Sequence, residues 1–278
     1  MSASYLCGLI GAGIQLSRSP ALHEREADAQ GLRYIYKLID LDKLGVGVEA
    51  LPELLSAAKR VGFAGLNITY PCKQAIVPLL DALSEDARAL NAVNTVVIRD
   101  GRLSGYNTDW WGFAEGFRRG LPDARLDRVV QLGAGGAGAA VAHAALTLGT
   151  KQLMIFDIDL RRSAELAKNL GSKASAPNDL AVAMASADGL IHCTPTGMAK
   201  MPGMPLDAGL LRAKHWVAEI VYFPMETELL RVARTKGCRT VDGGGMAVFQ
   251  AVGAFRLFTG IEPDAERMMR HFLSMDAR

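Results

Sequence analysis

The chain has 278 residues, of which 50% are hydrophobic and 22% are charged, a composition typical of a globular protein with one large or two smaller domains. Its 31 Lys and Arg residues nearly balance 29 Asp and Glu residues, so no charge excess favours nucleic acid, and a small-molecule partner is expected. The four cysteines lie far apart without a Cys-x-x-Cys pair, and the N-terminal residues lack the apolar run of a signal peptide or membrane span. We therefore expect a cytoplasmic protein with no membrane partner.

Short apolar strands alternate with helices in the first part of the chain. Strands are predicted at 5–11, 34–40 and 65–69, and helical stretches at 49–61, 73–80 and 84–90. Ser19 is expected to be an N-cap followed by Pro20 in the first turn of a helix that stops at Gly31. Asp100-Gly101, between segments 92–99 and 102–106, predicts a β-hairpin, and a helix should follow Thr108 as far as Arg119.

A second alternating series begins at Arg128. Strands are predicted at 128–132, 152–157, 189–193, 216–221 and 239–242, with helices at 137–148 and 160–170. From Gly244 the chain should form two helices broken near Gly260 and Pro263. The pattern predicts two α/β units with mainly parallel sheets.

The segment after the strand at 128–132 matches the pattern Gly-x-Gly-x-x-Gly. It consists of Gly133, Ala134, Gly135, Gly136, Ala137 and Gly138. The first glycine permits a tight turn, the second lets the backbone approach a pyrophosphate, and the third allows close helix packing. The free N–H groups of the following helix attract the anion. The alternative is a strand–helix turn without a ligand, but the strand, the helix and an acidic residue, Asp157, at the end of the next strand favour dinucleotide binding.

Asp157 bears on the choice of cofactor. A carboxylate there accepts the hydroxyls of an adenosine ribose and repels a 2′-phosphate, which favours NAD over NADP. Arg161 and Arg162 follow closely and could instead clamp a phosphate. For Arg161, a solvated position on the first helical turn is at least as good an explanation. NAD is the predicted cofactor, with NADP left possible.

Several further motifs together resemble one enzyme family. The motifs are Ser17-Arg-Ser19-Pro20, Gly65-Leu-Asn67-Ile-Thr69-Tyr-Pro71-Cys-Lys73, Ala92-Val-Asn94-Thr95, Gly105-Tyr-Asn107-Thr108-Asp109, Thr194-Pro-Thr-Gly197-Met198, Val221-Tyr222-Phe-Pro224 and Asp242-Gly-Gly-Gly-Met246-Ala-Val-Phe-Gln250. In order and spacing, from about residue 8 to residue 260, the set is similar to the shikimate dehydrogenase family. The end of the strand at Asp157-Ile-Asp159 resembles the NAD-using bacterial quinate/shikimate dehydrogenases, and the Asn-Arg-Thr motif of NADP-using members is absent.

The resemblance implies a fold and a reaction. Residues 1–107, completed by helices in 244–278, would form an N-terminal α/β substrate domain, and 108–243 a Rossmann-type doubly wound dinucleotide-binding domain. The enzyme would reversibly oxidise a ring hydroxyl of shikimate and/or quinate with NAD as hydride acceptor. Alternatives are an NADP-dependent biosynthetic enzyme, a family member for another hydroxylated or amino-substituted ring acid, and a catalytically silent dinucleotide-binding regulator. The protein could be a monomer or a homodimer. The spacing of the histidines predicts no metal site.

Site residues carry over from the family position by position. The resemblance makes Lys73 the acid/base and Asp109 its partner. Ser17, Ser19 and Tyr222 would hold the substrate carboxylate, and Thr69, Asn94 and Gln250 would contact ring hydroxyls. Thr194 and Gly243, with Arg162, would join the glycine turn and Asp157 in binding the dinucleotide.

Without the resemblance, these residues have simpler explanations. Lys73 would be a solvated helical residue, Asp109 a first-turn carboxylate and Ser19 an N-cap. Burial lowers a lysine pKa and a nearby carboxylate raises it, so sequence does not give the net shift.

Two positions depart from the family pattern. His192-Cys193-Thr194 replaces the common Asn-Ala-Thr, and a packed, hydrogen-bonded His192 is favoured over a proton relay. Cys72 replaces an aromatic residue or histidine beside Lys73 and is interpreted as a small packing residue.

Overall fold

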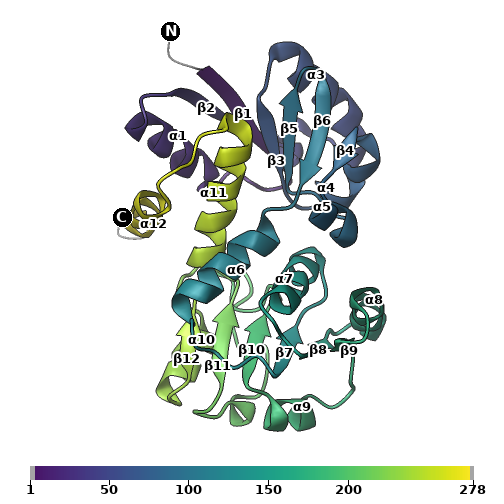
Figure 1. The fold of residues 1–278 in the computed structure, drawn as a ribbon, viewed down its shortest axis with the longest axis vertical. Helices are drawn as coiled ribbons and strands as arrows, with labels where there is room; N and C mark the ends of the chain where they lie inside the picture. Colours follow the sequence, from purple (N-terminus) through teal and green to yellow (C-terminus); the bar gives the residue numbers. More distant parts are fainter. Residues whose placement is uncertain (1–3, 276–278) are drawn as a thin grey trace. The chain divides into compact units, whose positions relative to one another are not determined.

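The computed structural model describes residues 4–275, which form two compact units with one sheet each (Figure 1). Of the described residues, the first unit comprises 4–108 and 250–275, and the second comprises Asp109–Phe249. The boundaries expected from sequence lay at 107/108 and 243/244. The second division falls inside the continuous helix α11 (Gly244–Thr259), because its two halves pack on different units: Gly245 approaches the backbone of Gly116, whereas Phe258 packs on Gly65.

The sheet of the first unit is mixed. Its strands are β1 (Ser4–Gly11), β2 (Arg33–Asp40), β3 (Gly65–Ile68), β4 (Ala82–Leu83), β5 (Thr95–Arg99) and β6 (Arg102–Tyr106), in the order β2-β1-β3-β5-β6-β4. β1 is parallel to β2 and β3, whereas β5 is antiparallel to β3 and β6. The predicted hairpin is confirmed, since Asp100 and Gly101 both have positive φ, the type I′ geometry that matches the strand twist.

Helices and short 3₁₀ turns flank this sheet. They are α1 (Ser19–Ala29), α2 (Leu41–Leu44), η1 (Val48–Ala50), α3 (Leu51–Val61), α4 (Cys72–Ala75), η2 (Val77–Leu79), α5 (Glu85–Leu90) and α12 (Ala265–Ser274). One expectation was wrong: Ser19 is the first helical residue and not the N-cap, and its N–H is instead accepted by the Ser17 hydroxyl at 3.3 Å. The helical stretch expected over 73–80 is present as two short pieces, α4 and η2, because Pro78 has no N–H to continue the α-helical ladder.

The second unit has an all-parallel sheet. Its strands are β7 (Arg128–Leu132), β8 (Gln152–Phe156), β9 (Ala174–Ser175), β10 (Gly189–His192), β11 (Trp216–Glu219) and β12 (Arg239–Val241). Their order, β12-β11-β10-β7-β8-β9, is the doubly wound Rossmann order, with the direction of winding reversed between β7 and β10. The predicted bounds of β7 are confirmed.

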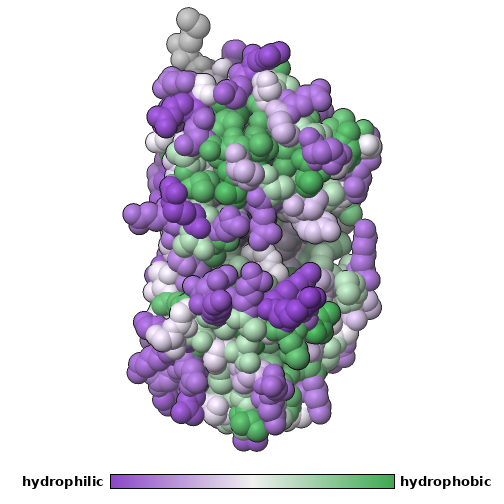
Figure 2. Space-filling view, turned by 90° about the vertical axis from the view of Figure 1, so that its right-hand side faces the viewer, coloured by the Kyte–Doolittle hydropathy of each residue, from purple (hydrophilic) through white to green (hydrophobic). Residues whose placement is uncertain are grey.

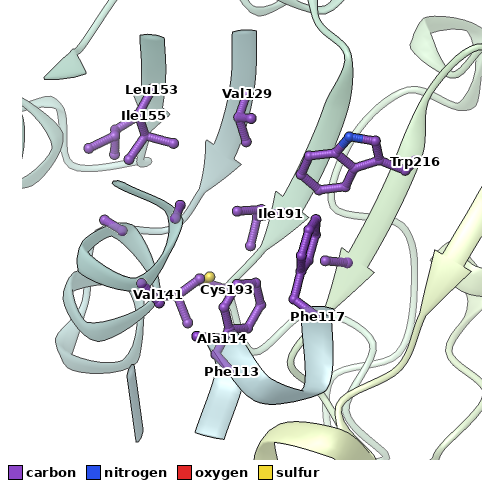
Figure 3. Packing of buried hydrophobic residues seen from close by; sticks show 14 of the residues in the cluster. Phe113, Ala114, Phe117, Val129, Val141, Leu153, Ile155, Ile191, Cys193 and Trp216 are labelled. Atoms are coloured by element: carbon purple, nitrogen blue, oxygen red, sulfur yellow. The ribbon is translucent and has the colours of Figure 1, made fainter. Parts of the chain in front are cut away.

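The helices of the second unit connect and cover these strands. They are α6 (Asp109–Gly120), α7 (Gly136–Thr147), α8 (Leu160–Leu170), α9 (Leu180–Ser186), η3 (Ala208–Leu210) and α10 (Glu228–Thr235). α6 packs its aromatic face on the sheet: Figure 3 shows Phe113 and Phe117 directed toward Val141, Ile191 and Trp216. The rings of Phe117 and Trp216 meet edge to face with centroids 4.9 Å apart, a favourable aromatic geometry.

Figure 2 shows one face of the molecule, on which patches of hydrophobic residues are bordered by hydrophilic ones. Between residues 4 and 275, none of the helices combines the length and the apolar character needed to span a bilayer.

A buried carboxylate attaches the C-terminal helix of the first unit. Glu26 on α1 is 1% exposed and accepts hydrogen bonds from the Asp264 N–H at 2.8 Å and from Nε and a terminal nitrogen of Arg267, both at 2.7 Å. Since α12 begins at Ala265, these three bonds attach the start of that helix to α1.

Glu26→Gln should therefore lower the free energy of unfolding by about 1–3 kcal/mol, because the amide accepts through one oxygen and leaves the guanidinium with only the more distant carboxylate of Asp264. Asp28→Asn, on the exposed side of the same helix, should change it by less than about 0.5 kcal/mol. Urea unfolding of both variants measures the difference, and equal stabilities would refute the role of Glu26.

Candidate functional site

The loops that carry the predicted substrate residues open at one edge of the first sheet. The chain leaves β1, β3 and β6 there, and it enters the antiparallel β5 at the same edge. The five predicted residues of these loops are Ser17, Ser19, Thr69, Lys73 and Asn94. Strand direction alone thus brings together residues far apart in the sequence.

Asn94 holds the end of β6 at this edge. Its side chain is 3% exposed, and its Oδ1 accepts the Thr108 N–H at 2.7 Å and the Thr95 hydroxyl at 2.9 Å. Its Nδ2 donates to the Thr108 hydroxyl at 3.0 Å. The amide therefore fixes the residue that directly precedes Asp109, and its predicted contact with a ring hydroxyl stays a prediction.

A buried polar network continues from Asn94 toward Ser19. Asn67 donates to the Thr95 hydroxyl at 3.1 Å and accepts from the Tyr36 hydroxyl at 2.8 Å. Burial raises the pKa of Tyr36 well above its ordinary value, the nearby Cys7 raises it further, and a hydrogen bond with Ser19 opposes the shift. Tyr36 is therefore a neutral link between the predicted carboxylate-binding and hydroxyl-binding residues. Tyr36 had no predicted role, because a tyrosine on a predicted strand gives no signal of its own.

Lys73 lies half-buried on the short helix α4. Its carbonyl accepts the Val93 N–H at 2.9 Å, which ties α4 to the residue before Asn94. On the preceding turn, Thr69 donates its N–H to the Ile10 carbonyl at 2.9 Å and accepts the Cys72 N–H at 2.8 Å. Cys72 is completely buried in the core, which confirms the interpretation of a packing residue.

The remaining residues predicted to meet the substrate are distributed over both units. Gln250 belongs to the first unit, on α11, whereas Asp109 and Tyr222 belong to the second. Asp109 begins α6 and is 7% exposed, and Tyr222 lies after β11 with 41% of its surface exposed. Their catalytic and substrate-binding roles stay predictions.

The glycine turn of the second unit follows β7 as expected. Gly133 has φ +99° and donates its N–H to the Phe156 carbonyl at 2.7 Å, and a Cβ at Gly138 would collide with the Gly133 carbonyl oxygen. The fully buried Gln131 donates to the carbonyls of Gly133 and Gly138 at 2.9 and 2.8 Å. Gln131 thus clamps both ends of the turn. Gln131 was not predicted as a site residue, although a lone amide in the otherwise apolar part of β7 was an available signal.

The turn leaves an accessible surface where an anion would bind. Gly135 and Gly136 are exposed, and a Cβ built on either meets no atom within 4 Å. They stand at the start of α7 between Ala134 and Ala137, where the first helical N–H groups have no intrahelical acceptor. This combination of open backbone and helix N-terminus fits a pyrophosphate.

Asp157 lies beside the turn, at the end of β8. Its Oδ2 accepts the Ala134 N–H at 2.7 Å and its Oδ1 accepts the Asp159 N–H at 2.9 Å. Each carboxylate oxygen has two lone-pair directions, so the geometry fits additional hydrogen bonds from ribose hydroxyls. Asp159 caps α8 and attracts both arginines, with the Nε of Arg161 at 3.3 Å and that of Arg162 at 3.8 Å from its carboxylate.

Two other predicted dinucleotide residues lie after the ends of two further strands, β10 and β12. Thr194 follows β10, the strand beside β7, and its methyl group would lie 3.1 Å from a Cβ at Gly133. Gly243 is buried after β12, and a Cβ there would meet the Val221 carbonyl oxygen at 2.6 Å. His192, which precedes Thr194 by two residues, is fully buried and hydrogen-bonded, as expected.

Comparison with known proteins identifies the family. Residues 9–96 match the model of a shikimate dehydrogenase substrate binding domain, and residues 243–271 match that of a shikimate 5′-dehydrogenase C-terminal domain. A protein of Streptomyces avermitilis named shikimate dehydrogenase (NADP(+)) is 62% identical over 96% of this chain and 94% of its own length. The chain belongs to the shikimate dehydrogenase family.

Other members of the shikimate dehydrogenase family are also similar over the whole chain. A Corynebacterium efficiens protein named quinate/shikimate dehydrogenase (NAD(+)) is 51% identical and covers 98% of this chain and 99% of its own length. The structure of quinate dehydrogenase from Corynebacterium glutamicum in complex with NAD superposes with a TM-score of 0.94, at 48% identity over 98% of this chain and 100% of that one. Both the substrate-domain and Rossmann architectures predicted from sequence are therefore confirmed.

The glycine turn of this family member allows a stability test. Gly138→Ala should lower the free energy of unfolding by about 1–3 kcal/mol, because the added Cβ collides with backbone that Gln131 holds in place. Gly136→Ala adds the same methyl group to open space and should be neutral or slightly stabilising. Thermal unfolding distinguishes the two, and equal melting temperatures would contradict the close approach.

Proposed function

We propose that this protein is an NAD-dependent oxidoreductase that reversibly converts a ring hydroxyl of shikimate and/or quinate to a ketone. The observation that carries the proposal is the carboxylate of Asp157, anchored by hydrogen bonds beside an open glycine turn in a sheet of Rossmann order. Relatives named shikimate dehydrogenase and quinate/shikimate dehydrogenase support the class of substrate.

The cofactor preference rests on local charge. A 2′-phosphate placed beside Asp157 would meet a carboxylate that two backbone N–H groups hold in position. The two negative charges would repel each other. Arg161 and Arg162, the cations that could compensate, lie against Asp159. The more similar relative from Streptomyces avermitilis is named for NADP, but the Corynebacterium efficiens relative and the Corynebacterium glutamicum structure are named for NAD. We assign NAD on the position of Asp157.

The chain would hold the dinucleotide with the glycine turn and the start of α7 at the pyrophosphate, Asp157 at the ribose, and Thr194 and Gly243 after the ends of β10 and β12. When bound, NAD supplies a hydride acceptor. The protein must then accept the hydroxyl proton, and the Nζ of Lys73 is the group we assign to that step, with Asp109 orienting the hydroxyl. In the reverse direction the protonated Lys73 returns the proton to the developing alkoxide.

The substrate would be held by the polar edge of the first sheet. Ser17 and Ser19 have hydroxyl groups suited to a carboxylate, and the bond between them, 3.2 Å from Oγ to Oγ, places both hydroxyls at one spot. Tyr222 would assist them, and Thr69, Asn94 and Gln250 would meet ring hydroxyls. All four cysteines are buried free thiols, which supports a reducing, cytoplasmic location for the reaction.

Absorbance of NADH or NADPH, with shikimate and quinate as separate substrates, tests this function. We expect turnover with NAD and at least one of the two acids. Turnover only with NADP would identify the biosynthetic alternative, and no turnover with any pair would refute the assigned substrates and direct the search to other ring acids. Dinucleotide binding without turnover of any ring acid would identify a silent regulator.

Lys73→Ala should lower kcat by about 10²- to 10⁴-fold, the range typical of a lost acid/base group, while the Kd for NAD changes by less than about twofold. Lys59→Ala, at an exposed position of α3, is the matched control and should retain full activity. Steady-state kinetics with calorimetric NAD titration provides both numbers. Comparable kcat values for the two variants would remove Lys73 from the mechanism.

Asp157→Asn should raise the Kd for NAD about 3- to 10-fold and lower the Kd for NADP, because the amide removes the charge but keeps an oxygen for a backbone N–H. Asp179→Asn, which alters the N-cap of α9 in the same unit, should leave both constants unchanged. Titration of each variant with each dinucleotide measures the preference. An equal loss of affinity for both would exclude Asp157 from the ribose site.

A further inference from the structure

A fully buried histidine–glutamate pair lies beside the place where the Rossmann sheet reverses. His192 ends β10 and Glu219 ends the adjacent β11, and neither side chain is exposed. The Nδ1 of His192 is 2.9 Å from Oε1 and 3.0 Å from Oε2 of Glu219. The catalytic assignment above uses neither residue, and a buried pair of titratable groups at a ligand-binding edge needs an explanation.

The other contacts of Glu219 define the direction of these bonds. Its Oε1 accepts the Val221 N–H at 3.0 Å, and its Oε2 accepts the Thr227 hydroxyl at 3.1 Å. The Thr227 oxygen itself accepts the Leu230 N–H at the start of α10, so its proton is directed to the carboxylate. Val221 and Thr227 thus both donate to Glu219, and a carboxylate that accepts at both oxygens takes the proton of its bond with His192 from Nδ1.

The far side of the imidazole contacts Thr194. The Nε2 of His192 is 2.5 Å from the Thr194 hydroxyl oxygen, which also accepts the Thr196 N–H at 3.3 Å. With a neutral imidazole, Nε2 accepts the Thr194 proton and the oxygen keeps a lone pair for a ligand. With an imidazolium, Nε2 donates to the Thr194 oxygen, and the hydroxyl proton points away from His192. Either form gives the hydroxyl one orientation.

We propose that His192, held by Glu219, is a positioning residue that orients the Thr194 hydroxyl toward the dinucleotide. This inference rests on the proposed function, since Thr194 is a dinucleotide residue only there. The imidazole contacts both groups at once, Glu219 through Nδ1 and Thr194 through Nε2. The histidine therefore extends the network by one hydrogen bond, from the carboxylate of β11 to the hydroxyl beside the glycine turn.

His192→Asn, Thr194→Val and the double variant test the proposal. Asparagine keeps a donor for Glu219, and valine keeps the shape of threonine without its hydroxyl. Each single substitution should raise the Kd for NAD about 3- to 10-fold, the effect of one hydrogen bond. The Kd of the double variant for NAD should lie within about twofold of the higher Kd of the two single variants, because both changes act through the same hydroxyl. His271→Asn, in the first unit, should leave the Kd unchanged.

Calorimetric titration with NAD, with circular dichroism to verify folding, separates the outcomes. A lowered melting temperature of His192→Asn with an unchanged Kd would overturn the proposal in favour of a purely structural pair. The proposal would also be overturned if the rise in Kd for the double variant equalled the product of the rises for the two single variants. His192 would then act independently of Thr194. If the unsubstituted protein binds neither NAD nor NADP, the proposed function itself fails and the inference fails with it.

Discussion

Both units depend on one constraint. The backbone N–H and C=O groups at the points where the chain leaves a sheet need hydrogen-bond partners, and here side chains provide them. In the first unit Asn94 accepts the N–H of Thr108, two residues after the end of β6. In the second, Gln131 binds two carbonyls of the glycine turn, Asp157 accepts two N–H groups, and Glu219 accepts the N–H of Val221. Because Asn94, Gln131 and Glu219 are buried, the loops they hold start from fixed points, and a site built on such loops needs little reorganisation.

The proposed catalytic pair shows how far this constraint reaches. Val93 donates its N–H to the carbonyl of Lys73, and the next residue, Asn94, accepts the N–H of Thr108, which directly precedes Asp109. Two adjacent residues before β5 therefore anchor the backbone on which both reactive side chains depend. A substitution at Asn94 would disturb this anchor as well as any contact with substrate, so loss of activity alone would not distinguish the two roles.

Sequence was informative where a pattern is local and uninformative where a contact depends on the sheet. The glycine turn, the Asp100-Gly101 hairpin and the bounds of β7 and α8 follow from short-range chemistry and were predicted. The two-residue strands β4 and β9 have no periodicity to detect. Ser19 looked like an N-cap because Pro20 follows it, but Ser17 accepts its N–H. The pairing of His192 with Glu219 arises from the register of two strands, which no single segment of sequence encodes.

Overall similarity does not determine the cofactor in this family, since relatives at 62% and 51% identity are named for different dinucleotides. The preference must therefore be local, and Asp157 is a local group with two functions, because it carries the charge and also ties β8 to Ala134. A change of cofactor would require a replacement that still satisfies the glycine turn. The proposed pyrophosphate and ribose sites are thus one rigid element, and the His192–Glu219 pair makes Thr194 equally fixed on the other side of β7. A dinucleotide would meet three preformed strand ends, which reduces the entropy lost on binding.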